Sequence, residues 1–257
     1  MPSSAIRTFT DPVEYFTGIR NLQIVGIVQR RGEFRARSTR IDLHRLWMHR
    51  FDENLPCIMK VTPSRTRALI IFATGADRPT MRVNGIEISQ NQIANIALDW
   101  EWYLRSSAPC EWGTMSLAPK DLRAAGEAIT GRELLPATFA RSLAPPARAL
   151  SRLRKLHEAA SHLAKTAPDI LAKPEVARAI EQALVEAMVF CLADGKSQNA
   201  RNVERSRAKL MQRMEEVLMA NPDEPLYMAE LCAQVGASYW TLRDCCLEYL
   251  GMSPKRY

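Results

Sequence analysis

The chain has 257 residues, of which 47% are hydrophobic, and a formal net charge of +7. This length accommodates two domains that each bury a core, and the positive charge suits a polyanionic partner. The charge does not mark where such a partner binds, because residues 201–257 hold eight basic and eight acidic side chains. The first residues lack an apolar leader, and no stretch approaches the roughly 18 apolar residues of a membrane span. We therefore expect a cytoplasmic protein with no membrane partner.

Short apolar alternations separated by turn residues fill residues 22–117, which is typical of a β-sandwich or barrel. The clearest turn is Asn84-Gly85, because both residues accept the positive φ values of a two-residue hairpin turn. The predicted strands are Gln23–Arg30, Phe34–Thr39, Leu43–Arg50, Cys57–Val61, Ala68–Ala73, Thr80–Val83, Ile86–Ser89, Ile93–Leu98 and Trp112–Leu117. Nine short strands with such turns predict a cupin-like β-barrel or jelly roll.

A barrel that senses a ligand needs an apolar interior with a few placed polar groups. Aromatic side chains and two arginines of this region could supply both, the arginines for an anionic effector. A barrel that folds around these side chains with no ligand is the alternative interpretation. The candidate ligand-binding residues are Arg45, Trp47, Phe72, Arg82, Trp100, Trp102 and Trp112.

Metal and catalytic chemistry find little support in the sequence. A cupin metal centre would need His44, His49 and Glu53 to converge, but residues five apart on a strand face opposite sides. His157 and His162 are also five apart, which is a poor ligand spacing in a helical segment. The chain has no Gly-rich phosphate loop and no nucleophile elbow, and its six cysteines show no Cys-x-x-Cys spacing. We expect no cofactor, no metal, no enzyme activity, and reduced, buried thiols.

Three helices are predicted after the strands: Pro119–Thr130, Arg148–Thr166 and Pro174–Ala193. The last two form an antiparallel hairpin, because Ala167-Pro168-Asp169 breaks the chain between them. Their apolar seams comprise Leu150, Leu153, Leu156, Ala160 and Leu163 in one helix, and Val176, Ile180, Ala183, Leu184, Ala187 and Cys191 in the other. These seams either contact the barrel or form a homodimer interface.

A polar stretch, Lys196–Asn202, is the predicted linker to the last segment. After it, Val203–Ala220 carries Leu210, Met214, Val217 and Leu218 on one face and should be a helix that supports the C-terminal residues.

The last segment has the pattern of a helix-turn-helix. Met228–Val235 places apolar residues at helical spacing, Gly236 supplies a permissive turn, and Ser238 can cap a helix that begins at Tyr239. The second helix buries Leu242, Cys245, Cys246, Tyr249 and Leu250. An ordinary helical hairpin is the alternative interpretation.

Side chains near the N-terminus of a recognition helix meet the base edges in the major groove, and arginine reads guanine best. Arg243 is therefore the first candidate for base contact. Lys255 and Arg256 follow the helix and would contact phosphate, which fixes register without reading sequence. The candidate DNA-binding residues are Ser238, Tyr239, Trp240, Thr241, Arg243, Asp244, Lys255 and Arg256.

The run NPDEPLYMAELCAQVGASYWTLRDCCLEYLGMSPKRY resembles the first helix-turn-helix of the AraC/XylS family of transcription activators. The Leu231-Cys232 pair, the Gly-x-Ser turn and the closing GMSPKRY follow the order of the family. Two residues depart from it: Tyr227 replaces the usual Ser or Thr cap, and Cys232 the usual Ala. The resemblance implies a cupin-like sensing domain, dimerisation through the helical region, and a second helix-turn-helix after a linker helix.

Ser253 and Pro254 make a good start for that linker helix, but only three residues follow. Because an isolated helix needs about 12–15 residues, we expect a chain truncated after the first helix-turn-helix, with weakened DNA binding.

The sequence thus predicts an α+β protein in three parts: a cupin-like sensing domain (1–131), a helical linker and dimerisation region (132–195) and a first helix-turn-helix subdomain (196–257). The expected function is transcription regulation, with operator DNA, a small-molecule effector, a second copy and RNA polymerase as partners. The alternatives are a cupin-type metalloenzyme with a helical appendage and a protein-interaction module that no longer binds DNA.

Overall fold

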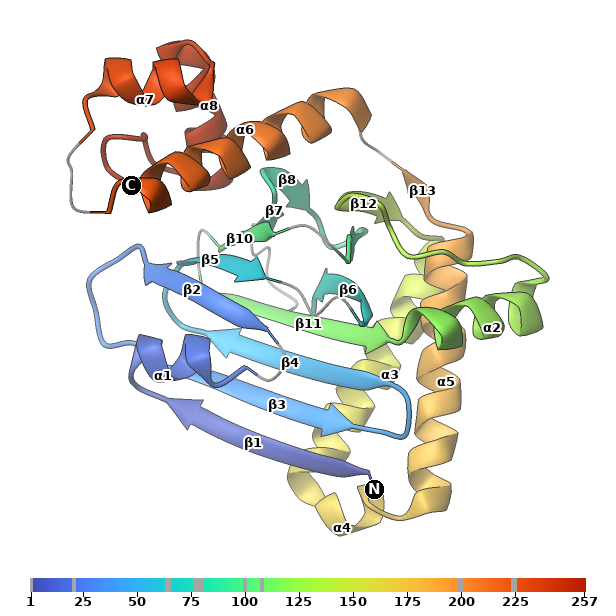
Figure 1. Ribbon diagram of the computed structural model, residues 1–257. Helices are drawn as coiled ribbons and strands as arrows, with labels where there is room; N and C mark the ends of the chain where they lie inside the picture. Colours follow the sequence, from blue (N-terminus) through green and yellow to red (C-terminus); the bar gives the residue numbers. More distant parts are fainter. Residues whose placement is uncertain are drawn as a thin grey trace.

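A computed structural model describes residues 2–19, 22–62, 66–75, 81–98, 101–106, 109–197, 201–222 and 226–257, with the backbone alone for residues 201–205. Two antiparallel sheets form its first half (Figure 1). The eight-stranded sheet has the order β1 (Ser3–Phe9), β3 (Ala36–Asp42), β4 (Trp47–Glu53), β11 (Cys110–Leu117), β6 (Ala68–Ala73), β9 (Ile93–Ile96), β12 (Arg141–Ala144), β13 (Lys196–Ser197). The five-stranded sheet has the order β2 (Gln23–Val28), β5 (Cys57–Thr62), β10 (Trp102–Ser106), β7 (Met81–Val83), β8 (Ile86–Ile88).

Alternation along the strands sends one set of side chains into a core between the sheets. Phe51, Ile71 and Trp112 enter it from the eight-stranded sheet, and Met59 and Leu104 from the five-stranded sheet. Helix α1 (Pro12–Thr17) closes one end with the buried rings of Tyr15 and Phe16. The α+β class is as predicted, whereas the cupin-like or jelly-roll character stays a prediction.

The hairpin predicted at Asn84-Gly85 is confirmed. The two residues have φ values of 51° and 77° and join β7 to β8. Positive φ at both central positions is the geometry that matches the twist of the flanking strands.

One predicted strand was misplaced. The prediction ran from Leu43 to Arg50, but Leu43–Leu46 is a turn in which the amide of Leu43 donates to the carbonyl of Leu46 at 2.9 Å, and β4 begins at Trp47. The buried carboxylate of Glu181 accepts the backbone N–H groups of Arg45 and Leu46 at 2.6 and 3.1 Å. A distant helix therefore stabilises this turn, which no local pattern indicates.

Five further elements of the first half and its edge were not predicted: β1, α1, β10, β12 and β13. Strands β12 and β13 lie in the stretches expected to be helical or linker, yet both extend the eight-stranded sheet. The division into three domains stays a prediction, and the sheet continues past the boundary expected at residue 131.

Helices cover the outer face of the eight-stranded sheet. They are α2 (Pro119–Thr130), α3 (Ala147–Thr166), α4 (Pro168–Leu171) and α5 (Pro174–Ala193), and the bounds of α2 and α5 are those predicted. Their buried side chains form one core with Met48, Ile70, Phe72 and Met115 from the sheet. The helical hairpin therefore contacts the barrel, which was one of its two predicted roles.

The buried faces of α3 and α5 are wider than the predicted seams. His157 and Ala164 are buried in α3, while Leu156 and Leu163 are only partly buried. In α5 the structure adds Ala177, Glu181, Val185, Met188 and Val189 to the buried set, because this helix contacts α2 and α3 as well as the sheet.

The last three helices form a separate layer over the outer face of the five-stranded sheet (Figure 1, orange to red). They are α6 (Arg201–Ala220), α7 (Met228–Val235) and α8 (Tyr239–Tyr249). We call residues 201–257 the reading unit. Among the helices of the described residues, none combines the length and apolar character that a membrane crossing requires.

Candidate DNA-reading site

Helices α7 and α8 form the predicted helix-turn-helix. Gly236 ends α7 in the left-handed conformation, with φ of 70°, and its amide donates to the carbonyl of Cys232 at 2.9 Å. The side chain of Ser238 caps α8 by accepting the amide of Thr241 at 3.2 Å. Glycine tolerates this conformation and serine satisfies an orphan amide, so the local sequence determines the turn.

The start of α7 has half of a capping arrangement. The carboxylate of Glu230 accepts the amide of Tyr227 at 2.9 Å, but Tyr227 itself provides no side-chain cap to the helix. Its ring is 78% exposed. The departure from the family's Ser or Thr cap therefore leaves one amide of the first turn without a side-chain acceptor.

Helix α8 has a buried face and an open face. Its buried residues are Leu242, Cys245, Cys246 and Tyr249, followed by Leu250, which is the predicted set. At its N-terminal end Trp240 is 66% exposed and Tyr239 41% exposed. The rings of Tyr239 and Trp240 contact each other, with centroids 5.4 Å apart, and form an exposed aromatic pair.

The open end of α8 holds its side chains in place by mutual contacts. The guanidinium of Arg243 lies 5.5 Å from the ring centroid of Trp240 and 3.3 Å from the carboxylate of Asp244. The hydroxyls of Ser238 and Thr241 are 2.8 Å apart. The guanidinium of Arg243, which is only partly exposed, is thus oriented by its neighbours on the same helix.

Lys255 and Arg256 lie in a turn after α8 and are exposed. The amides of Arg256 and Tyr257 donate to the carbonyl of Ser253 at 3.0 and 3.1 Å, so Ser253 begins a helix-like turn, as its sequence position indicates. All eight candidate DNA-binding residues therefore belong to α8 or its flanking turns, although their role in binding stays a prediction.

The candidate ligand-binding residues do not gather at one site. Trp102 and Trp112 are buried between the sheets, while Phe72 lies on the opposite face of the eight-stranded sheet, edge-on to His157. Arg82 is bonded within its own hairpin, to Glu87 and the Gly85 carbonyl. The predicted Trp100 lies outside the described residues.

The remaining two candidate ligand-binding residues, Arg45 and Trp47, lie near the β3–β4 turn. Arg45 forms an ion pair of 3.2 Å with Glu181, and Trp47 stacks under Arg67 at 3.8 Å. Arg45 also lines a surface pocket of about 470 Å³ between α2 and α5, together with Ile129 and Val185. This volume lies within the range of small-molecule sites.

Glu53 is a buried carboxylate between the sheets, bonded to a phenol and an indole. Its Oε1 accepts the Tyr15 hydroxyl at 2.6 Å and the Trp112 indole N–H at 2.9 Å. Burial raises the pKa of Glu53 to about 7, although both hydrogen bonds favour the ionised form. Nowhere in the described part of the chain do three or more His, Cys, Asp or Glu side chains gather as metal ligands would.

His157 is fully buried and has the environment of a structural histidine. Its Nε2 lies 3.0 Å from the carbonyl oxygen of His49, and burial lowers the pKa of the imidazole to about 3. Its ring fills the space beside Gly113, where a Cβ atom would lie 2.7 Å from it. Burial likewise raises the pKa of the buried thiols Cys57, Cys110, Cys191, Cys245 and Cys246, as expected for unreactive cysteines.

Sequence reasoning missed Glu215. It lies in α6 beside the predicted apolar face of Leu210 and Met214, is 8% exposed, and binds side chains of the five-stranded sheet. The sequence does contain a signal for its burial: a carboxylate next to the apolar face of a helix must find hydrogen-bond donors if it is buried.

No protein-family model and no curated protein matches the sequence. Among solved structures, the AraC-like transcriptional activator CuxR is similar over 97% of this chain and 92% of its own, with 13% identity and a TM-score of 0.51. ToxT from Vibrio cholerae is similar over 84% of this chain and 98% of its own (10% identity, TM-score 0.30), and its unsaturated fatty acid-bound form over 91% and 74% (6%, 0.29). The likeness to CuxR shows a shared fold, whereas the ToxT scores are too low to show one.

Proposed function

We propose that the chain is a sequence-specific DNA-binding transcription regulator rather than an enzyme. The observation that carries this proposal is the division of α8 into two faces: Leu242, Cys245, Cys246 and Tyr249 are buried, while at the N-terminal end Trp240, Thr241 and Asp244 are exposed and Arg243 is half-buried. This is the end of a recognition helix that meets base edges. The fold shared with an AraC-like activator supports it.

Selection of binding sites from a random pool of DNA duplexes tests this function at low salt. The wild-type chain should enrich one motif, and Arg243→Ala should lose discrimination at one base pair, which costs about 1–3 kcal/mol. Arg178→Ala, which removes an exposed arginine of α5, is the matched control and should enrich the wild-type motif. Failure of the wild-type chain to enrich any sequence would contradict the proposal.

The two exposed cations after α8 have a different expected role. Lys255→Ala and Arg256→Ala should weaken binding to all DNA sequences alike. Each should also make the negative slope of log K against log salt less steep, by about 0.9 for each phosphate that is no longer neutralised. A change in the selected motif would assign these residues to base contact instead.

We further propose that the N-terminal part of the chain senses a small-molecule effector, with the pocket between α2 and α5 beside Arg45 as the candidate binding site. A thermal-shift screen of anionic metabolites tests it. A ligand that raises the melting temperature of the wild-type chain should lose its effect in Ala128→Phe, which fills the pocket, but not in Ala172→Phe, an exposed control on another surface.

Regulators that read two half-sites are usually two-fold symmetric, so we propose a homodimer, with RNA polymerase as a further partner. Several seam residues of α3 and α5, among them Leu156, Leu163 and Ile180, are only partly buried within one chain, so this helical region stays our candidate for the dimer interface. Analytical ultracentrifugation at micromolar concentration should show a dimer, and a monomer at all concentrations would contradict this part.

A further inference from the structure

The core of the reading unit is completed by the five-stranded sheet, which we call the sensor sheet. Leu210 and Met214 of α6, Leu231 of α7 and the buried residues of α8 form one cluster, and this cluster includes Ile58 of β5 and Tyr103 of β10. The ring of Tyr103 contacts that of Tyr249 at a centroid distance of 5.9 Å. A unit of three helices and fewer than 60 residues buries little surface alone, so the five-stranded sheet completes its core.

Strands β5 and β10 therefore serve two cores at once. Met59 and Leu104 point into the core between the sheets, while their neighbours Ile58 and Tyr103 point to the reading unit. Successive residues of a strand face opposite sides, so a displacement of either strand moves both sets of side chains.

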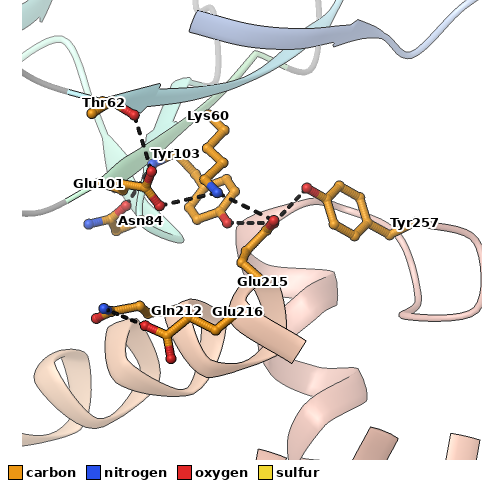
Figure 2. A network of polar contacts seen from close by, with 9 residues as sticks. All are labelled: Lys60, Thr62, Asn84, Glu101, Tyr103, Gln212, Glu215, Glu216 and Tyr257. Carbon is orange, nitrogen blue, oxygen red and sulfur yellow. Dashed lines mark hydrogen bonds and ion pairs between the residues drawn. The ribbon is translucent and has the colours of Figure 1, made fainter. Parts of the chain in front are cut away.

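A polar cluster fixes the contact, and Figure 2 shows it. The carboxylate of Glu215 accepts the hydroxyl of Tyr103 at 2.8 Å and that of Tyr257 at 2.6 Å, and Lys60 Nζ lies 3.3 Å from its second oxygen. Lys60 is also 3.1 Å from Glu101. We call Lys60, Tyr103, Glu215 and Tyr257 the latch.

Two further bonds attach the C-terminal end of α8. Arg105 donates to the carbonyl of Leu247 at 3.0 Å, and Gln29 to that of Leu250 at 3.3 Å. Leu247 lies in the last turn of α8 and Leu250 is its C-cap residue, so Arg105 of β10 and Gln29, which follows β2, add donors at the C-terminal end of the helix. The opposite end of α8, with Trp240, stays open.

We propose that the latch holds the reading unit in its DNA-binding conformation and transmits changes of the sensor sheet to α8. The inference rests on the proposed function for its DNA readout only. Opening the latch exposes the shared core, so α8 loses order and DNA affinity falls. Any displacement of β5 or β10, which carry Ile58 and Tyr103, thereby changes DNA binding without touching α8.

Glu215 is the residue on which the latch depends. Its carboxylate is almost completely buried and satisfies three donors from different elements. Removing one partner of a buried charge cluster leaves the others desolvated and unpaired, which is more damaging than removing an exposed pair. The neighbouring Glu216 offers a matched control, because it bonds to Gln212 of its own helix at 2.9 Å, on an exposed surface.

Hydrogen exchange of the full chain tests the latch without DNA. Glu215→Ala should raise amide exchange in α8 and the second half of α6 by at least about tenfold, with β4 and β11 unchanged, and Glu216→Ala should resemble wild type. Unchanged exchange of α8 in Glu215→Ala would overturn the proposal. Should that variant not fold, Tyr257→Phe, which removes one hydroxyl of the latch, must show the same pattern at smaller amplitude.

DNA affinity gives the second readout, by fluorescence anisotropy with a duplex selected by the wild-type chain. Glu215→Ala should weaken binding about tenfold or more, and Glu216→Ala less than twofold. Faster exchange of α8 with unchanged affinity would overturn the regulatory role of the latch. Faster exchange together with a wild-type chain that selects no duplex would reject the proposed function and leave the mechanical coupling supported.

Discussion

The two sheets each carry a helical cover on their outer face, but the covers are attached in different ways. The eight-stranded sheet contributes buried side chains from six strands to the core beneath α2, α3 and α5. The five-stranded sheet contributes only Ile58 and Tyr103, among the described residues, to the core beneath the reading unit. Apolar area sets the strength of such contacts, so the first cover should be permanent and the second releasable.

Each cover also has a buried glutamate, and the pair differ in what they bind. Besides its ion pair with Arg45, Glu181 accepts two backbone N–H groups of the β3–β4 turn, whose positions are fixed by the chain. Glu215 is held by side-chain groups of Lys60, Tyr103 and Tyr257, which can rotate away. A buried carboxylate that is held mainly by backbone groups should therefore mark a contact that stays in place. A buried carboxylate that is held by side chains should mark a contact that can open.

The largest expected effect tests whether the covers unfold separately. Leu184→Ala, at a fully buried position of α5, should lower the free energy of unfolding of the sandwich by about 2.7–5 kcal/mol. Leu242→Ala, equally buried in α8, should instead disorder the reading unit and leave the main calorimetric transition in place. One common transition that shifts equally in both variants would show that the two covers are not different.

A second prediction concerns the pH dependence of the free energy of unfolding. It reports on the core between the sheets alone, because Glu53 lies in that core and, among the described residues, bonds to neither helical cover. The pKa of Glu53 is about 7 in the fold and about 4.5 as its ordinary value, so the folded chain binds more protons than the unfolded chain between these values. Stability contributed by this group is thus full below pH 4.5 and falls as pH rises to 7, by about 3 kcal/mol.

Glu53→Gln should remove that slope when the free energy of unfolding is measured by urea titration across the window. The amide still accepts the Tyr15 and Trp112 bonds at one oxygen, so its other costs are independent of pH. Glu33→Gln, at an exposed carboxylate, is the control and should keep the wild-type slope. Parallel pH curves for wild type and Glu53→Gln would mean that this carboxyl titrates normally.

The smallest expected effects concern the N-terminal caps of α7 and α8 in the reading unit, which is the cover that we expect to be releasable. Ser238→Ala removes the cap of α8 and should lower the stability of the reading unit by about 1 kcal/mol. Tyr227→Thr should complete the capping box with Glu230 and raise it by a similar or smaller amount. Hydrogen exchange of α7 and α8 measures both, and a stabilising Ser238→Ala would refute the assigned cap.

Helix bounds were predictable because local chemistry determines them. Pro119, Pro174, Gly236 and Ser238 each act within one turn, and α2, α5, α7 and the start of α8 fall where these residues indicate. The exposed end of α8 was predictable for the same reason, from the spacing of Leu242, Cys245 and Cys246.

Features that depend on distant partners were not predictable. The turn at Leu43–Leu46 needs Glu181, and the buried role of Glu215 needs Lys60 and Tyr103, each more than 100 residues away. Phe72 and Trp112 looked equivalent as aromatic residues of strands, yet they lie on opposite faces of one sheet. A pattern of period two predicts that two faces exist but not which neighbour each face meets.

Strand β13 also affects how long the reading unit could stay detached from the five-stranded sheet. Its residues Lys196 and Ser197 pair with Leu143 and Ala144 and anchor the chain to the sheet edge, and α6 begins only four residues later, at Arg201. Four steps of extended backbone reach on the order of 14 Å. An undocked reading unit would therefore remain at a high effective concentration near its own sheet and rebind intramolecularly, so each release would be brief rather than lasting.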